Sequence, residues 1–301
     1  MGEAEPRERV AERTAPVPVP WTSYLPALTA LAVLAAAVVL VFFAHRETAP
    51  VWQVFALALL AFSCEFVDSS LGMGYGTTLT PLLLLMGYEL KVTVPVVLLS
   101  EFVTGLMAGG FHHALGNAHF GRRSRDSKVT AVLAGAGLFG ALVAVKFLTT
   151  VPAFWAKLYF AVMITGMGLL ILWRRNDRYR FSWAKVAALG LISSFNKGMS
   201  GGGYGPLVVG GQVLSGCDAK NAVGCTSLAE SFVCFVALVG FAASGVFPAV
   251  ALAVPIVLGA VLSAPLAAAM TKFLDRRLDL KRVVGFGVLL LGALCLYKVL
   301  G

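Results

Sequence analysis

A glycine-rich motif occurs twice in the chain, and each copy interrupts a long apolar segment. The first copy, at residues 68–78, reads DSSLGMGYGTT, and the second, at residues 197–207, reads KGMSGGGYGPL. The two copies lie 129 positions apart, and the same offset aligns Glu101 with Glu230 and Lys91 with Lys220 without a gap. The chain therefore contains one structural unit twice.

The composition indicates an integral membrane protein. Of the 301 residues, 58% are hydrophobic and only 13% are charged, and a soluble core of this size could not bury so much apolar surface. Apolar runs of about twenty residues recur, and each is long enough to cross a hydrocarbon layer of about 30 Å as a helix. We therefore predict an all-α, polytopic bundle of membrane helices.

The positive charge does not indicate a nucleic-acid partner, although the formal net charge is +9. Most of the 24 lysines and arginines lie in four short stretches outside the apolar runs, which is typical of cytoplasmic loops. The five cysteines have no CxxC spacing and are expected to be small buried hydrophobic residues. We predict no metal site, no cofactor and no nucleic-acid binding.

The apolar runs divide the chain into four parts. Residues 1–23 are polar and proline-containing and are predicted to be a disordered cytoplasmic tail, and residues 24–44 an additional N-terminal membrane helix outside the repeat. The first repeat covers 51–173 and the second covers 183–301. Each repeat is expected to begin with a hairpin broken at the glycines. Full spans follow at 91–112, 127–149 and 153–173, and again at 219–244, 247–271 and 281–300.

The distribution of basic residues predicts that the two repeats have opposite orientations in the membrane. Basic stretches at 122–128, 174–185 and 272–282 are expected on the cytoplasmic side, and the uncharged turns at 150–152 and 245–248 outside. At the offset of 129, a basic loop of one repeat aligns with an uncharged turn of the other. The result is an inverted-topology repeat with two re-entrant hairpins, typical of secondary transporters. The expected location is the cell (inner) membrane, with the N-terminus cytoplasmic and the C-terminus outside.

The glycine motifs are candidates for an anion-binding site near the bilayer centre. Broken backbone at this depth must be buried in protein or line a polar cavity, and each following half-helix directs its positive N-terminal end at the break. The alternative is that the glycines only permit close helix packing. The candidate substrate-binding residues are Gly72, Gly74, Tyr75, Gly76 and Thr77 in the first hairpin and Ser193, Asn196, Lys197, Gly201, Gly202, Gly203, Tyr204 and Gly205 in the second.

Ionisable residues flank both motifs. Asp68 and Lys197 occupy equivalent positions, and they form either a buried ion pair or a site in which Lys197 binds the anion and Asp68 carries a proton. Glu101 and Glu230 lie about ten residues into the following spans. They are either proton-coupling residues or hydrogen-bond partners of glycine-loop amides. Asp68, Glu101 and Glu230 are thus the candidates for proton coupling.

The twin glycine hairpins, the Gly-Tyr-Gly tips, the following Pro81 or Pro206 and the duplicated halves resemble the sulfite exporter TauE/SafE family over residues 52–300. The resemblance implies a transporter of small sulfur-containing anions such as sulfite or organosulfonates. We expect alternating access, with a small anion, protons and the lipid bilayer as partners. A passive anion channel and a membrane thiol-disulfide electron carrier are the alternatives. No Ser–His or paired-Asp arrangement occurs within one span, so we predict no catalytic residues and no enzyme activity.

Overall fold

The computed structural model describes residues 50–301 apart from 73, 174–181, 215–216, 218 and 275–277. The predicted tail at 1–23 and the predicted additional helix at 24–44 lie outside the described residues. Within the described part the chain forms helices and no strands.

The described helices follow the apolar segments closely. They are α3 (Val51–Leu71), α4 (Tyr75–Leu85), α5 (Leu90–Ala114), α6 (Arg125–Thr150), α7 (Ala153–Leu172), α8 (Trp183–Ser200), α9 (Gly205–Leu214), α10 (Ala219–Ala243), α11 (Val250–Leu274) and α12 (Leu278–Leu300). Among the described residues, six helices are long and apolar enough to cross a membrane, namely α3, α5, α6, α7, α10 and α11. The prediction of a polytopic helical membrane protein is confirmed.

The helix order repeats at the offset seen in the sequence. Shifting the bounds of α5 by 129 positions gives those of α10, and α3, α4, α6 and α7 correspond in the same way to α8, α9, α11 and α12. The packing follows this correspondence. α3 packs on α11, and its equivalent α8 packs on α6, which is the equivalent of α11. α5 packs on its own equivalent α10, and α7 packs on its own equivalent α12. These contacts are those expected of two units related by an approximate two-fold axis.

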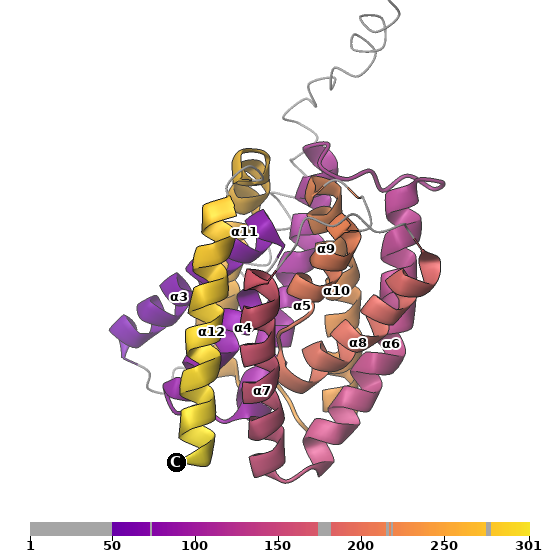
Figure 1. Cartoon of the computed structure of the whole chain (residues 1–301). Coiled ribbons are helices and arrows are strands. Elements are labelled where there is room, and N and C mark those ends of the chain that lie inside the picture. The colour runs from indigo at the N-terminus through magenta and orange to yellow at the C-terminus, as the bar shows by residue number, and fades with distance from the viewer. Residues whose placement is uncertain (1–49, 73, 174–181, 215–216, 218, 275–277) are drawn as a thin grey trace, which may run out of the picture.

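The two ends of the bundle differ in charge. Figure 1 shows the connection between α5 and α6, which contains Arg122 and Arg123, at the top, and the turn between α6 and α7 together with the C-terminus at the bottom. The bottom turns carry no charge at 150–152 or at 245–248. A basic connection at one end and two uncharged turns at the other agree with the positive-inside rule.

Small residues bring the paired helices into close contact. A Cβ added to Gly259 of α11 would lie 1.9 Å from the backbone oxygen of Ala58 in α3, and one on Gly140 of α6 would lie 2.3 Å from that of Leu191 in α8. Such approaches are typical of membrane helices, whose association depends on packing rather than on the hydrophobic effect. These contacts hold α3 and α8, which lead into the two glycine motifs, against α11 and α6.

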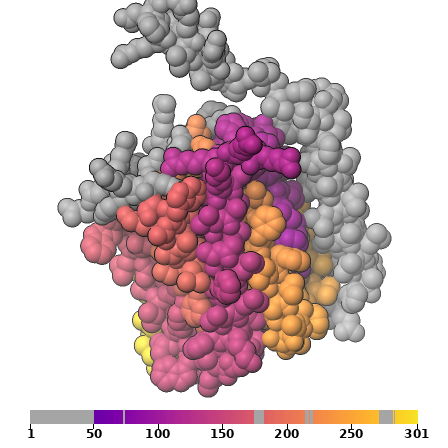
Figure 2. Space-filling view, turned by 90° about the vertical axis from the view of Figure 1, so that its right-hand side faces the viewer, coloured from indigo at the N-terminus to yellow at the C-terminus, as the bar shows by residue number. Residues whose placement is uncertain are grey.

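The outer surface is apolar and suited to lipid. Figure 2 shows the face along which α6 runs. On this helix Phe139 is 73% exposed and Val143 is 57% exposed, whereas Ala141 and Ala144 are fully buried. Large apolar side chains such as Phe139 and Val143 therefore point outward, where a helix of a soluble protein would carry polar residues.

Candidate functional site

Both glycine motifs break a helix in the same way. α3 ends at Gly72, whose φ is 69° and whose N–H donates to the carbonyl of Asp68. α8 ends at Gly201, whose φ is 71° and whose N–H donates to the carbonyl of Lys197. Because residues with side chains rarely adopt this left-handed conformation, glycine at these two equivalent positions determines where each hairpin turns.

The tips of the two hairpins are in direct backbone contact. A Cβ added to Gly76 would lie 1.6 Å from the backbone oxygen of Gly201, and one added to Gly202 would lie 2.6 Å from the carbonyl carbon of Gly76. At this point backbone fills the space between the tips. The cavity of the site lies beside the tips instead, toward α3, α5 and α10.

Lys197 is the charged centre of the site. Its side chain is 1% exposed and its ammonium forms ion pairs with Glu101 of α5 and with Glu230 of α10, the latter at 2.6 Å. The two glutamates come from equivalent positions of the two repeats and meet at one lysine. Glu101 and Glu230 therefore act as counterions of Lys197, and Asp68, the partner considered from the sequence, is not one of its two ion-pair partners.

Further carboxyl groups lie next to this ion-pair triad. A cavity of about 10 Å³ is lined by Glu65 and Asp68 from α3 together with Glu101 and Glu230. Glu65 is 2% exposed, and its Oε1 accepts a hydrogen bond of 2.5 Å from Ser69. Its Oε2 has no hydrogen-bond partner among the described residues. The site thus combines one ammonium with four carboxyl groups.

Sequence reasoning missed Glu65. Its equivalent in the second repeat is Ser194, so the comparison of repeats did not single it out. The signal that could have found it is the spacing of Glu65, Asp68 and Ser69, which places all three on one face of α3. The structure directs that face at the cavity.

The two tip tyrosines differ in their hydrogen bonding. The hydroxyl of Tyr75 lies 2.6 Å from Ser100 Oγ, whereas the hydroxyl of Tyr204, which is fully buried, has no partner among the described residues. The difference arises because the position equivalent to Ser100 in the second repeat is Ala229. A buried hydroxyl without a partner costs about 1–3 kcal/mol, so Tyr204 is a donor that a ligand or water can use.

The remaining predicted residues form the polar surroundings of the tips. Thr77 Oγ1 and Ser193 Oγ are buried without a partner among the described residues. Asn196 Oδ1 accepts a hydrogen bond of 2.5 Å from Tyr159, and Ser200 Oγ accepts one of 3.0 Å from the N–H of Gly202. Gly74, Gly203 and Gly205 lie in or beside the two breaks, with positive φ at Gly74 and Gly203.

The tyrosine pair provides a matched test. Tyr204→Phe removes a hydroxyl that no described residue pairs, so we expect unchanged or slightly higher thermal stability; if the site binds an anion, as the sequence predicts, the affinity measured in a flux assay should fall about tenfold. Tyr75→Phe leaves Ser100 without its partner, so we expect a loss of about 1 kcal/mol in stability and little change in affinity. If the two variants had the same effects on affinity, Tyr204 would have no special part in binding.

The five cysteines, at positions 64, 217, 225, 234 and 295, are free thiols. Burial raises the pKa of the Cys217 thiol in the connection between α9 and α10, and the opposing effects of Arg125, which lowers the pKa, and Asp126, which raises it, do not reverse this. A protonated thiol is a poor nucleophile, which disfavours exchange chemistry there. Cys217 therefore lends no support to the thiol-disulfide electron carrier considered from the sequence.

Comparisons with known proteins agree with the geometry. The model of the family described as sulfite exporter TauE/SafE matches residues 55–295. The chain is also 28% identical over 201 residues to the probable membrane transporter protein YtnM of Bacillus subtilis (strain 168), and this match covers 63% of the chain and 64% of that protein. The match thus spans less than two thirds of the relative, and no solved structure gives a significant match. The family model covers most of the chain, and the chain belongs to the sulfite exporter TauE/SafE family of multi-pass membrane transporters.

Proposed function

We propose that this protein is a secondary transporter of small sulfur-containing anions, sulfite or organosulfonates, and that it works by alternating access. The observation that carries the proposal is the convergence of two broken helices, one from each repeat, beside a buried lysine. Repeats of this kind, with broken helices at the middle of the membrane, are the usual framework of carriers that open to each side in turn.

Several features favour an anion as the solute. Lys197 supplies a positive charge once one of its two glutamates has moved away, and the first turns of α4 and α9 supply helix N-termini on either side of the tips. The unpartnered hydroxyls of Thr77, Ser193 and Tyr204 add neutral donors. A sulfite or sulfonate group presents three oxygens, which such a set of donors satisfies better than a carboxylate with two.

The described conformation leaves little space at the site. The cavity of about 10 Å³ holds at most about one water molecule, and the tips are in contact at Gly76 and Gly201. A solute therefore requires the tips to separate and Lys197 to release a glutamate. Closure by backbone contact also favours a carrier over the passive channel, because a carrier must close its path in every cycle.

Competition for Lys197 supplies a mechanism of proton coupling. An anion that binds Lys197 must replace Glu101 or Glu230, and the displaced carboxylate then lies buried beside the negative solute. Taking up a proton removes that repulsion and the cost of an unpaired buried charge. Proton binding and anion binding therefore favour each other, and by linkage the two move in the same direction.

Flux measurements on the purified full chain in proteoliposomes test the function. Methanesulfonate is the better probe because its charge is constant near neutral pH, whereas sulfite itself binds a proton there. We expect saturable uptake and counterflow against unlabelled methanesulfonate, and accumulation when the outside is made acidic. A channel would give no counterflow, and the absence of any methanesulfonate or sulfite flux would overturn the proposed function.

Variants separate transport from coupling. In Glu101→Gln and Glu230→Gln we expect counterflow to continue and the accumulation driven by the pH gradient to fall at least about tenfold, because a neutral amide cannot release a proton. The control is Asp126→Asn, which changes a carboxylate in the first turn of α6 that lines neither this cavity nor the one described below. Accumulation that responds to pH equally in all three variants would eliminate coupling through these glutamates and leave anion transport intact.

A further inference from the structure

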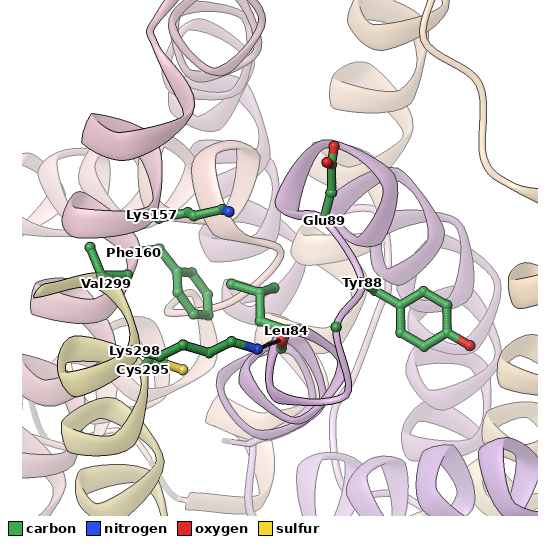
Figure 3. A pocket seen from close by; sticks show the side chains of 9 residues that line it. Leu84, Tyr88, Glu89, Lys157, Phe160, Cys295, Lys298 and Val299 are labelled. Atoms are coloured by element: carbon green, nitrogen blue, oxygen red, sulfur yellow. Dashed lines mark hydrogen bonds between the residues drawn. The ribbon is translucent and has the colours of Figure 1, made fainter. Parts of the chain in front are cut away.

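A second polar cavity lies at the end of the bundle opposite the connection between α5 and α6. It has a volume of about 250 Å³ and is formed where α4 ends, α7 begins and α12 ends; we call it the α4–α7–α12 pocket. Figure 3 shows two lysines, Lys157 of α7 and Lys298 of α12, on its wall with the ring of Phe160 between them. A cavity of this size suits a small solute with a few waters rather than a large organic ligand.

The pocket is positively charged. Lys298 donates hydrogen bonds of 2.9 Å and 3.4 Å to the carbonyls of Leu84 and Leu85, and so neutralises the negative C-terminal end of α4. Lys157 is half-buried and has no hydrogen-bond or ion-pair partner among the described residues. Glu89 lines the pocket and, in the described part of the chain, forms no ion pair with either lysine. Lys157 therefore offers an unused charge in a partly enclosed cavity.

The duplicated fold does not require these lysines. The position equivalent to Lys157 in the second repeat is Phe286, and the position equivalent to Lys298 in the first is Leu169. α7 and α12 pack on each other, and at each of these two positions one helix has a lysine where the other has an apolar residue. The two charges are thus not repeated in the other half, and Lys157, unlike Lys298, has no hydrogen bond or ion pair in the described part of the chain that would give it a role in the fold.

Two helices connect the pocket with the tips. α4 has 11 residues, so it extends about 16 Å from Tyr75 at the tip to Leu85 at the pocket. On α7, Lys157, Phe160 and Met163 share a face, and Met163 Sδ lies 2.9 Å from the position that a Cβ on Gly203 would take. Phe160 is fully buried between the pocket and that contact. One helix face therefore leads from Lys157 to the second glycine motif.

From these observations we propose that the α4–α7–α12 pocket is a second binding site for a small oxyanion, which occupies it on its way to or from Lys197. Lys157 is the residue that binds the anion, Lys298 offsets the helix end that would repel it, and Phe160 separates this site from the centre. The inference rests on the proposed transport of anions, but occupancy of the pocket can be measured without transport.

Thiol labelling measures the pocket directly. Val299 also lines it, so Val299→Cys in a Cys295→Ala background places a thiol there. We expect an anionic methanethiosulfonate reagent to react faster than a cationic one, and methanesulfonate to slow both reactions. Adding Lys157→Gln should lower the ratio of the two rates about tenfold and abolish the protection, whereas the exposed Lys146→Gln on α6 should change neither.

Transport kinetics supply the second measurement. When methanesulfonate is supplied on the side of the membrane where the pocket lies, Lys157→Gln should raise its KM about tenfold and leave kcat unchanged. Lys157→Arg should restore the KM. Protection that depends on Lys157 in a protein that carries no anion would support the pocket and refute the proposed function. Normal transport with an unprotected thiol and an unchanged KM in Lys157→Gln would refute the pocket alone.

Discussion

Replacing Lys197 with methionine is expected to abolish anion transport and to lower the free energy of unfolding by about 3–5 kcal/mol. The side chain is 1% exposed and forms ion pairs with two glutamates that are themselves 4% and 6% exposed. Removing the lysine leaves both carboxylates buried without a cation, and breaking a buried ion pair from one side is among the most costly single substitutions. Thermal unfolding in detergent and flux in proteoliposomes measure the two effects.

A triple variant separates the charge from the shape of the site. Lys197→Met combined with Glu101→Gln and Glu230→Gln removes all three charges at nearly constant volume, so we expect most of the lost stability to return. Transport should stay absent, because no cation remains for the solute. Lys146→Met is the control and should change stability by less than about 0.5 kcal/mol, since that side chain is exposed. A Lys197→Met protein with normal flux would show that the solute binds elsewhere.

The helices could be predicted well from the sequence because hydrophobic length and glycine breaks determine them locally. The span expected at 91–112 is α5 at Leu90–Ala114, and the span expected at 219–244 is α10 at Ala219–Ala243. The start expected at 247 was wrong by three residues, because α11 begins only at Val250. The turn that precedes it contains Gly245 with φ of 76° and Pro248.

The partners of Lys197 could not be predicted in the same way. Asp68 and Lys197 are equivalent residues of two repeats, but equivalent residues meet only where both lie beside the axis that relates the repeats. The structure brings Glu101 and Glu230 to one atom, which places that pair beside the axis. Which equivalent pair lies there depends on how α5 and α10 cross, and a sequence offset does not contain that angle.

The asymmetry of the site was also hidden by the repeat. In the alignment of the two halves, Glu65 is equivalent to Ser194 and Ser100 is equivalent to Ala229. These two differences supply a fourth carboxyl group on one side of the site and an unpartnered tyrosine hydroxyl on the other. The duplicated residues determine where the two halves meet, whereas the residues that differ determine which polar groups are left to act on a solute or a proton.

Gly76→Ala is expected to lower the free energy of unfolding by about 3 kcal/mol, the upper end of the usual range for overpacking, and to abolish transport. An added Cβ would lie 1.6 Å from the backbone oxygen of Gly201, and backbone on both sides of the contact cannot move away as a side chain could. Alanine within a helix normally stabilises it relative to glycine by about 0.5–1 kcal/mol, so a loss here would reverse the usual sign. The measurements are again thermal unfolding and flux.

Two comparisons assign that effect to the contact between the tips. Gly166→Ala, at a helical glycine of α7 with nothing within 4 Å of the added Cβ, should be neutral or slightly stabilising and should transport normally. Gly202→Ala changes the other side of the same contact, with an added Cβ 2.6 Å from Gly76. Because either substitution alone separates the tips, the double variant should lose less stability than the sum of the two. Additive losses would mean that the glycines act independently, and the hairpin tips would then not close on each other.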